Sequence, residues 1–567
     1  MSESNSIPMP FGSSPSPCAI FPHTLNDFAY HSPFSKFNYT GFARFVNAPS
    51  TLRQAQGAKH PAPSTLSLSK GTVSPIHYLW YHAGTMNITK RLIAPLVIVC
   101  LAMLLRLGYI AVAPRGMQFE NVDAQGYHWL AVNLLERRVF SMNTEPPFRS
   151  DDVRAPLYPL VLAALYSFTG PDPRAVALIQ AALDSVTVAV AFRLGQRVAG
   201  RRAGLLTALL YALHPASWRF CNELLTEILF GLLLTASLWM FARYILAGRN
   251  RDALLCGLFS GASILCKPNV QFLPLVLLGI LLHGLYTGRR AWWQGAVIVT
   301  ATIGLMLLPW MVRNRVVFGR WFYTMTFEDN LAHVSAVATL AHVQGEAVAP
   351  WTPRWEAIYD EVIAQAAARY GWTTRDQAEL STRERDLRLQ QITTVAGDIV
   401  RAHPVDFIVA HTWSWMRSFV PQEHRFWYER LSGQRWDALP ALQGDALGRA
   451  LEAARHGQIV NAANVIIRER LLALPPLARV LWMGWGIGYL VGAILFCMGA
   501  LRLKPRVLSL VLVATVFYVT FLPGPISQIR FRLPVVPVIL LLAVIGVIGV
   551  RRYGDKETRG HSDTVTR

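Results

Sequence analysis

Asp123 is the first acidic residue whose surroundings could support chemistry. It opens the segment 123–138, where Trp129, Leu130 and Leu134 recur at the spacing of an amphipathic helix. We therefore expect Asp123 near the N-cap of a helix on the membrane surface, and capping alone would explain a carboxylate there. A carboxylate fixed at that place could also act as general base for an acceptor hydroxyl.

A second acidic site lies in the segment 222–227, which contains Glu223 and Glu227. Residues four apart share one face of a helix, so both carboxylates should face one cavity at the outer end of a span. A favourable position in the dipole of that helix would also explain them. Asp184 lies deeper, inside an apolar run, where it could form a helix–helix hydrogen bond or serve as a proton site.

Basic residues at the outer ends of the expected spans form a third group. The topology described below places on that side Arg115, Arg154, Lys267, Arg313, Arg315, Arg530 and Arg532. Basic residues usually collect on the cytoplasmic side, so these exceptions need a reason. Snorkelling to lipid head groups explains any one of them. As a set they favour a site for a lipid phosphate, because Arg and Lys both bind phosphate well.

The composition places the elements that hold these residues in a membrane. Of the 567 residues, 53% are hydrophobic and 16% are charged, and the mean hydropathy is +0.31, whereas soluble chains carry about 25% charged residues. Lys and Arg outnumber Asp and Glu by 54 to 34. This excess clusters at the ends of apolar runs, and no nucleic-acid-binding motif is found, so it indicates membrane orientation. The six cysteines show no metal-ligand spacing.

The apolar runs predict an all-α polytopic membrane protein with about ten transmembrane helices. The expected spans are residues 92–113, 174–193, 203–220, 225–246, 252–266, 270–287, 292–312, 477–500, 507–523 and 533–550. With the N-terminus inside, the main Lys/Arg clusters fall on the cytoplasmic side. This requires that the run 156–169 does not cross. It is short and contains two prolines, so we expect a juxtamembrane helix in the first outer loop.

The same topology divides the chain into parts. Residues 1–85 are rich in Ser and Pro and are expected to be a disordered extension, with Met86 as the natural start. The parts that follow are an N-terminal transmembrane catalytic module, 86–312, with the first outer loop at 114–173; a small mixed or helical outer (periplasmic) module, 313–475; the C-terminal transmembrane helices, 476–553; and a cytoplasmic tail, 554–567.

The outer module contains helical patterns and several tryptophans. Residues 355–370 and 382–402 are expected to be helices, and residues 405–420 an interfacial helix. Aromatic walls for a sugar could come from Trp351, Trp355, Trp413, Trp415 and Trp427. Anchoring at a membrane edge is the commoner use of tryptophan, so both interpretations stay open.

Six short motifs follow one another in a specific order. They are Asp123-x-x-x-Tyr127, Arg154-x-Pro-Leu-Tyr158-Pro159, Leu-Thr-Glu227, Lys267-Pro268, Pro309-Trp-Met-Val-Arg313-Asn314 with Phe318-Gly319, and Arg530-Phe-Arg532-Leu-Pro-x-x-Pro537. With these motifs the chain resembles the GT-C class of membrane glycosyltransferases, and most of all the bacterial protein-mannosyltransferase and aminoarabinose-transferase-like group. The resemblance covers roughly residues 90–550.

The resemblance implies a GT-C-like bundle that transfers a sugar, with inversion, from a polyprenyl-phosphate donor at the outer face of a bacterial inner membrane. Asp123 would be the general base, and Glu227 would orient the acceptor or support the site. The substrate-binding residues would be Tyr127, Arg154, Tyr158, Glu223, Lys267, Arg313, Arg530 and Arg532. Among them Arg154, Lys267 and Arg530 or Arg532 would hold the departing phosphate. Ala124 replaces a Glu that is frequent in the family, so no metal ligand is assigned and a need for a divalent metal stays open.

The expected partners are the lipid-linked donor, a glycan, lipid or protein acceptor and the lipid bilayer, with no nucleic acid. The main alternative is a transporter or flippase of a lipid-linked saccharide, which would show broken helices in symmetry-related halves around a midplane site. A non-catalytic scaffold is a third interpretation. The acids and bases gather on one side, next to an outer segment of about 160 residues, and this favours an enzyme. Pocket shape, which the sequence does not reveal, decides the sugar and the acceptor.

Overall fold

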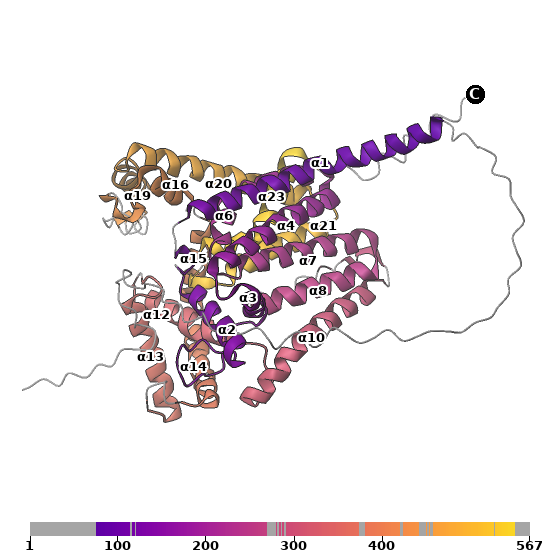
Figure 1. Cartoon of the computed structure of the whole chain (residues 1–567). Coiled ribbons are helices and arrows are strands. Elements are labelled where there is room, and N and C mark those ends of the chain that lie inside the picture. The colour runs from indigo at the N-terminus through magenta and orange to yellow at the C-terminus, as the bar shows by residue number, and fades with distance from the viewer. Residues whose placement is uncertain are drawn as a thin grey trace, which may run out of the picture. The chain divides into compact units, whose positions relative to one another are not determined.

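The computed structural model describes residues 75–113, 116–119, 121–268, 279, 283–284, 286–288, 291–346, 348–373, 380–419, 423–440, 449–450, 453, 457–526 and 528–549. Residues Thr85–Arg567 form one compact unit. All regular elements in the described residues are helices (Figure 1). Most of the expected extension 1–85, most of the expected span 270–287 and the tail 554–567 lie outside the described residues.

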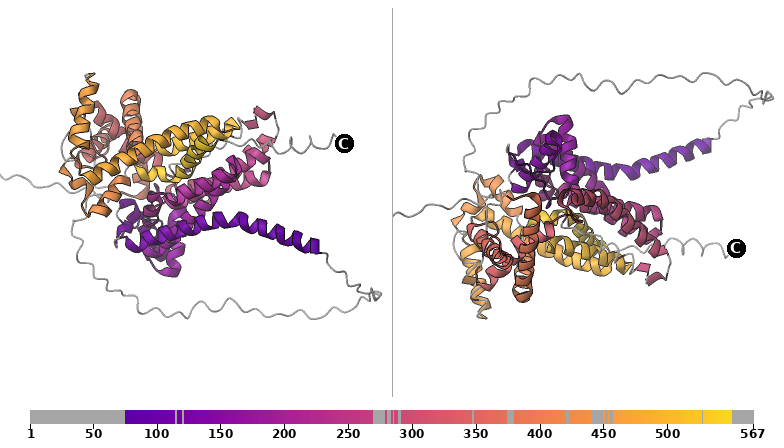
Figure 2. Two further views of the ribbon diagram at one scale, coloured as in Figure 1. Left: turned by 90° about the horizontal axis from the view of Figure 1, so that it is seen from above. Right: turned by 90° about the horizontal axis from the view of Figure 1, so that it is seen from below.

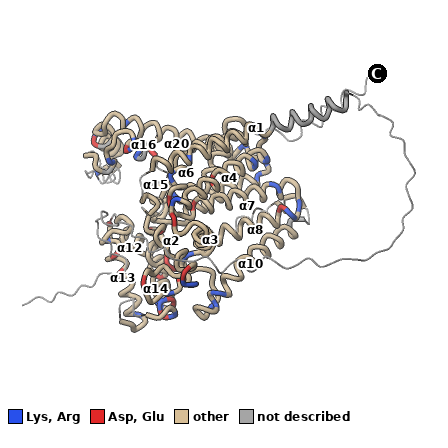
Figure 3. Tube along the Cα trace, in the orientation of Figure 1, with Lys and Arg blue, Asp and Glu red and all other residues tan. Residues whose placement is uncertain are grey.

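Six helical segments are long and apolar enough to cross a membrane. They are Leu92–Val112 of α1 (Pro75–Val112), α4 (Pro173–Ala199), α7 (Glu227–Ala247), Trp293–Phe318 of α10 (Ala291–Phe318), α20 (Pro476–Arg502), and Ile529–Ile548, which combines α22 (Ile529–Arg532), η7 (Leu533–Val535) and α23 (Val536–Ile548). Long stretches of these helices carry no charged residue, as Figure 3 shows. The prediction of an all-α polytopic membrane protein is confirmed.

Two other expected spans are shorter helices. Residues 252–266 correspond to α8 (Asn250–Cys266), of 17 residues, and residues 507–523 to α21 (Arg506–Phe521), of 16 residues. α21 is apolar, and α8 packs against α7 and α10. Each is shorter than the about 20 residues that a straight crossing needs. The count of ten spans therefore stays a prediction.

The expected span 203–220 is wrong as a single helix. The chain instead forms α5 (Arg201–Ala212) and α6 (Pro215–Cys221). Pro215 has no backbone N–H with which to continue the hydrogen bonds of α5, so the helix ends before it. The run 156–169 forms α3 (Leu157–Thr169), the short helix expected in the first outer loop.

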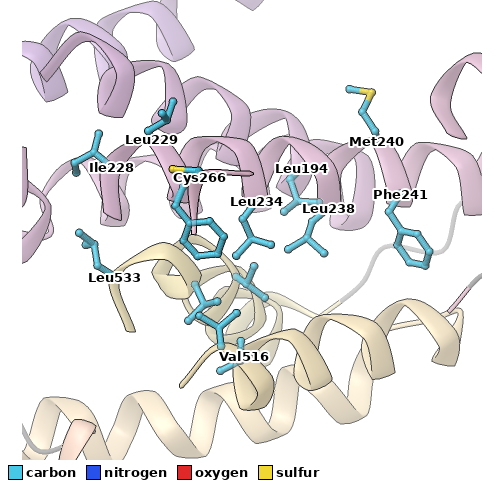
Figure 4. Close-up of a cluster of buried hydrophobic side chains, with 14 of the residues drawn as sticks. Leu194, Ile228, Leu229, Leu234, Leu238, Met240, Phe241, Cys266, Val516 and Leu533 are labelled. Carbon is cyan, nitrogen blue, oxygen red and sulfur yellow. The ribbon is translucent and has the colours of Figure 1, made fainter. Parts of the chain in front are cut away.

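The long helices pack side by side through apolar and small residues. α4 lies against α5 and α7, α7 against α8, α8 against α10, and α20 against α23 (Figures 1 and 2). Leu234 and Leu238 of α7 belong to the same buried cluster as Val516 of α21 (Figure 4). α20 and α23 approach so closely that a Cβ on Gly499 would clash with the Leu542 carbonyl oxygen. Small residues commonly allow such close helix contacts in membranes.

Asp184 is part of a network that joins four helices. Its carboxylate accepts hydrogen bonds from Arg106 Nε of α1 and from the Tyr211 hydroxyl of α5, each at 2.6 Å. Arg106 also donates to Ser217 Oγ of α6 at 3.0 Å. The Arg106 and Asp184 side chains are 0% and 1% exposed. Of the two interpretations of Asp184, the structure supports the helix–helix contact.

The Arg106→Leu variant is expected to lower the free energy of unfolding by roughly 3–5 kcal/mol, because Asp184 then stays buried without a counter-charge. The double variant Arg106→Leu/Asp184→Leu should recover most of this loss, since it buries no charge. Thermal unfolding in detergent compares both variants with the wild type. A double variant no more stable than Arg106→Leu would contradict this account of the pair.

The segment 313–475 is helical in its described part, and its first residues continue α10. The elements after α10 are α11 (Thr326–Asp329), η2 (Asn330–Ala336), α12 (Val337–Val343), α13 (Pro353–Tyr370), α14 (Thr382–Ala402), α15 (Pro404–Ser418), α16 (Glu423–Ser432), η4 (Trp436–Ala438), α19 (Ile459–Val465) and η5 (Ile466–Leu471). The three helices expected from the sequence are α13, α14 and α15. A capping box between Ser381 and Glu384 fixes the start of α14.

Candidate active site

Asp123 lies in the first turn of α2 (Val122–Arg137). The N-cap is Asn121, whose side chain accepts the Asp123 amide hydrogen at 2.9 Å, so Asp123 is not needed as a cap. Its carboxylate is bonded elsewhere. Oδ1 accepts from Arg154 Nη2 at 3.1 Å, and Oδ2 accepts from Arg530 Nη1 at 2.8 Å. The carboxylate is therefore held between two guanidinium groups.

The two arginines reach Asp123 from distant parts of the chain. Arg154 precedes α3, and Arg530 lies in the one-turn helix α22. The Asp123 side chain is 37% exposed, that of Arg154 19% and that of Arg530 14%. The guanidinium groups are thus sheltered, while the carboxylate keeps one side open, as a group that must meet a substrate requires.

Burial and charge act on Asp123 in opposite directions. Burial alone would raise the pKa of the Asp123 carboxyl, but Arg530 and Arg154 outweigh it and hold the pKa below its ordinary value. Asp123 is therefore ionised at neutral pH. A carboxylate paired in this way becomes more basic when another anion takes over its guanidinium partners.

A second ion pair lies next to the first. Glu227, the first residue of α7, accepts from Lys267 Nζ at 2.8 Å, and Lys267 is the C-cap of α8. Lys267 Nζ lies 4.7 Å from the centre of the Phe531 ring, and the Arg530 guanidinium carbon lies 4.7 Å from the same centre. Phe531 thus lies between Lys267 and Arg530. We call the five residues of these three ion pairs the charged cluster: Asp123, Arg154, Glu227, Lys267 and Arg530.

Glu223 does not share a helix face with Glu227, so that prediction is wrong. α6 ends at Cys221 and α7 begins only at Glu227. In the intervening turn the Glu223 carboxylate accepts from Arg219 Nε at 2.9 Å. The Glu223 carbonyl oxygen accepts from Gln180 Nε2 at 2.7 Å. Glu223 thereby ties the turn between α6 and α7 to α4.

Two tyrosines lie on the Arg154 side of the charged cluster. The Tyr127 ring centre is 5.6 Å from the Arg154 guanidinium carbon. Tyr127 packs edge to face on Tyr158 of α3, with ring centres 5.2 Å apart, and the Tyr158 hydroxyl donates to Gln180 Oε1 at 3.0 Å. Burial and, after it, the charge of Asp123 raise the pKa of Tyr127, so its hydroxyl stays protonated. The rings support Arg154 and do not titrate near neutral pH.

The loop that carries Arg154 is fixed by Asp151 and Arg313. Asp151 Oδ1 accepts the Arg154 amide hydrogen at 2.7 Å, and the Asp151 carbonyl oxygen accepts from Arg313 Nη1 at 3.2 Å. Arg313 was expected to bind substrate, and the structure places it as a brace for this loop. Three aromatic rings lie against its guanidinium: Phe140, Trp310 and Phe318.

Asp152 is a further titratable group of the same loop. Its carbonyl oxygen accepts the Met325 amide hydrogen at 2.8 Å, which attaches the loop to the segment before α11. Burial, followed by the charges of Asp151 and Asp386, raises the pKa of Asp152 to about 7. The sequence shows the adjacent Asp151, but not the burial of Asp152 or the approach of Asp386, which is far away along the chain.

Asp152 predicts a change of stability with pH. Its pKa is higher in the folded protein than the value of about 3.9 expected in the unfolded chain, so the folded state binds more protons between about pH 4 and pH 7. The free energy of unfolding should therefore fall by one to a few kcal/mol, an order-of-magnitude figure, across that window. Thermal unfolding from pH 4 to 8 should show less of this fall in Asp152→Asn; parallel curves would contradict the assignment.

Arg532 neighbours Arg530 in α22 but belongs to another group. Its Nη2 lies 3.1 Å from Glu423 Oε1 of α16, and its Nη1 donates to the Ser418 carbonyl oxygen at 3.1 Å. The Tyr489 hydroxyl of α20 donates to the same Glu423 oxygen at 2.6 Å. Arg532 and Glu423 are each 3% exposed. The structure thus separates the two arginines: Arg530 joins the charged cluster, and Arg532 anchors α22.

The tryptophans expected to line a sugar site differ in their surroundings. Trp355 is 1% exposed and lies in a hydrophobic core of the segment 313–475. Trp415 donates to the Thr520 hydroxyl at 2.9 Å and packs on Phe517 of α21. These two support the fold, and neither is placed to bind a sugar. Trp351 is exposed.

The chemistry of the charged cluster suits an anion. The cluster contains three cations: Arg154, Arg530 and Lys267. Both carboxylate oxygens of Asp123 are hydrogen-bonded to guanidinium groups. In the part of the chain that the structure describes, no group of three or more His, Cys, Asp and Glu residues could hold a metal ion. The side chains present therefore fit a phosphate better than a divalent cation.

Residues 153–312 match the family model of the dolichyl-phosphate-mannose-protein mannosyltransferases. The matched residues contain Arg154, Glu227 and Lys267 of the charged cluster. Over these residues the match confirms the predicted resemblance to GT-C membrane glycosyltransferases of the protein-mannosyltransferase group. A comparison with curated proteins finds no match.

Similar solved structures come from two kinds of membrane enzyme. The archaeal oligosaccharyltransferase AglB from Archaeoglobus fulgidus, in complex with an inhibitory peptide and a dolichol-phosphate, is 15% identical with a TM-score of 0.43; the match covers 80% of this chain and 50% of AglB. ArnT from Cupriavidus metallidurans, bound to undecaprenyl phosphate, is 14% identical with a TM-score of 0.35, covering 72% of this chain and 81% of ArnT. The chain spans about half the length of the archaeal protein.

Proposed function

We propose that this protein is a glycosyltransferase that moves a sugar from a polyprenyl-phosphate donor to an acceptor hydroxyl. The observation that carries the proposal is the Asp123 carboxylate held between Arg154 and Arg530, with Lys267 beside them. A base and a phosphate site are the two groups that displacement at an anomeric carbon needs. The match of residues 153–312 to the dolichyl-phosphate-mannose-protein mannosyltransferase family model supports the same conclusion.

The donor phosphate would compete with Asp123 for the arginines. The donor phosphate is a diester with one negative charge, and it gains a second as the bond to the sugar breaks. Because phosphate binds Arg forks and Lys well, it would draw Arg530, Arg154 and Lys267 toward itself, most strongly as the sugar departs. Asp123 would then lose the charges that lower its pKa and become a stronger base. Donor binding would thus prepare the base for the acceptor. Glu227 would keep Lys267 in place through their ion pair of 2.8 Å.

The transfer itself balances without a further reactant. The acceptor oxygen attacks the anomeric carbon and gives its proton to the Asp123 carboxylate. The bond between the anomeric carbon and the phosphate oxygen breaks, and its electron pair leaves on the phosphate, where the arginines and Lys267 stabilise the charge. Attack from the face opposite the phosphate inverts the anomeric configuration. No step is assigned to a metal ion.

The charges at the ends of two helices indicate on which side of the membrane the charged cluster lies. Glu227 begins α7 and Lys267 ends α8, while Arg243, Arg249 and Arg251 lie at their other ends. Basic residues mark the cytoplasmic end of a span. We therefore infer that the charged cluster faces outward from a bacterial inner membrane and that the segment 313–475 is an outer module on the same side.

Transfer is tested with purified protein in vesicles and polyprenyl-phosphate donors labelled in the sugar. With a membrane extract as acceptor, label should move to a product with inverted anomeric configuration, and unlabelled polyprenyl phosphate should appear in equal amount. A flippase would instead carry the intact donor across the bilayer. Movement of the donor without release of polyprenyl phosphate, for every donor tried, would overturn the proposal.

A further inference from the structure

An exposed tryptophan in the segment 313–475 packs against a histidine that is held by an aromatic ring and a carboxylate. Trp351 is 54% exposed. Its ring meets the His333 ring edge to face at 4.9 Å, and His333 in turn stacks on Tyr359 at 4.0 Å with an interplanar angle of 19°. His333 Nε2 lies 3.1 Å from Glu356 Oε2. We call Trp351, His333, Glu356 and Tyr359 the aromatic platform.

The backbone of Trp351 is held in an unfavourable conformation. Its φ is +65°, the left-handed region that bulky residues rarely adopt. Such a conformation persists only where the surrounding structure enforces it, and it is concentrated at functional sites. His333 lies in η2, a π-helical turn, which is another feature frequent at functional sites.

Local folding does not account for the Trp351 ring. Trp351 precedes Thr352, the N-cap of α13, and an apolar residue at that position often packs on the N4 residue as a hydrophobic staple. Here the N4 residue is Glu356, which is polar and paired with His333. Trp351 as a whole residue stays exposed, so it is available to a ligand.

The platform is connected to the charged cluster through Phe531. Trp355, whose ring centre is 6.4 Å from that of Trp351, packs in one buried cluster with Ile358 and Phe531. Lys267 Nζ and the Arg530 guanidinium carbon each lie 4.7 Å from the centre of the Phe531 ring. Trp355, Ile358 and Phe531 are buried, so they connect the platform and the charged cluster by packing within the protein.

The chemistry of the platform matches a sugar ring. A pyranose has an apolar C–H face and a rim of hydroxyl groups. An indole face can pack against the C–H face, while a carboxylate and an imidazole can form hydrogen bonds with the hydroxyl groups. Sites of this kind combine aromatic surface with a few placed polar groups. We propose that Trp351, His333 and Glu356 bind a saccharide ring of the acceptor. This assignment to the acceptor rests on the proposed function.

Binding is measured without donor, so that no transfer can take place. The probe is the oligosaccharide fraction released by mild acid from the source membranes, followed by ligand-observed NMR with the full-length protein in detergent. Trp351→Gly removes the ring and tolerates the positive φ, so folding should be kept. We expect its affinity for the oligosaccharides to fall by roughly tenfold or more. Trp321, which is 57% exposed and outside the platform, gives the matched control Trp321→Gly, with affinity unchanged.

Three results of the donor-free assay would overturn the assignment. They are equal affinities in wild type and Trp351→Gly, no binding of the oligosaccharides by the wild type, and Trp351-dependent binding of the lipid that remains after acid treatment. The last would indicate a membrane contact. A Trp351 effect on the labelled polyprenyl-phosphate sugar alone would assign the ring to the donor and also overturn the proposal. Because the binding assay contains no donor, its result does not depend on the separate transfer assay. If Trp351-dependent saccharide binding is found but the transfer assay fails with every donor, the proposed function and the assignment to an acceptor are removed, while the saccharide site stands.

Discussion

The Asp123→Asn variant should lose sugar transfer by roughly 10²–10⁴-fold, the usual contribution of a general base. The amide keeps the size of the carboxylate and cannot take the acceptor proton. Donor binding should be kept or strengthened, because Arg154 and Arg530 then lack the carboxylate that occupies them at 3.1 and 2.8 Å. Steady-state transfer and binding of a polyprenyl-phosphate donor measure the two effects separately.

The matched control for this variant lies on the same helix. Glu136 is 46% exposed in α2 and pairs only with its neighbour Arg137 among the ion pairs described for it. Glu136→Gln removes the same charge and should change transfer by less than about twofold, as surface pairs contribute little. If Asp123→Asn retains the rate of Glu136→Gln, another group takes the proton.

The second large effect is expected for Arg530→Ala. This change removes one of the two charge-assisted bonds to Asp123 and one of the three cations near the proposed phosphate site. The KM for the donor should rise by roughly thirtyfold or more, equivalent to about 2 kcal/mol or more for a sheltered charged pair. Arg530→Lys keeps the charge without the fork and should show a smaller rise. Arg401→Ala, at a residue 75% exposed, is the control.

The same variant predicts the direction of a pH shift. After burial, Arg530 has the largest influence on the Asp123 carboxyl and lowers its pKa. Without Arg530 this pKa rises, so transfer on the acid side should be lost at a higher pH than in the wild type. The rate against pH, measured at subsaturating donor, checks this. If the pH at which transfer is lost on the acid side is unchanged or lower in Arg530→Ala, the pairing of Arg530 with Asp123 is contradicted.

The helices could be predicted from the sequence because hydropathy and charge act locally. Runs such as 174–193 and 477–500 became α4 and α20, with longer ends. The prediction failed where one residue breaks a helix within an apolar run. Pro215 divides the run 203–220, and hydropathy averaged over twenty residues does not register a single missing hydrogen-bond donor.

The candidate site could be predicted only in part, because side-chain pairing depends on long-range contacts. The residue types and the order of motifs drew attention to Asp123, Arg154, Lys267 and Arg530. Nothing local could show that Arg530 reaches Asp123 across 407 positions while Arg532, two residues on, is buried elsewhere. The pairing of Glu223 with Arg219 is local, four positions apart, and was missed for another reason: α6 ends at Cys221, so Glu223 lies in a turn and not on the helix of Glu227.

The most direct test of the central claim compares wild type and Asp123→Asn in one assay with purified protein. A polyprenyl-phosphate donor labelled in the sugar is incubated with membrane extract, and bound donor, labelled product and free polyprenyl phosphate are quantified together. We predict that the wild type forms product and free polyprenyl phosphate in equal amounts, while Asp123→Asn binds the donor and forms almost none. Equal product from both proteins would contradict the assignment of Asp123 as the base between Arg154 and Arg530.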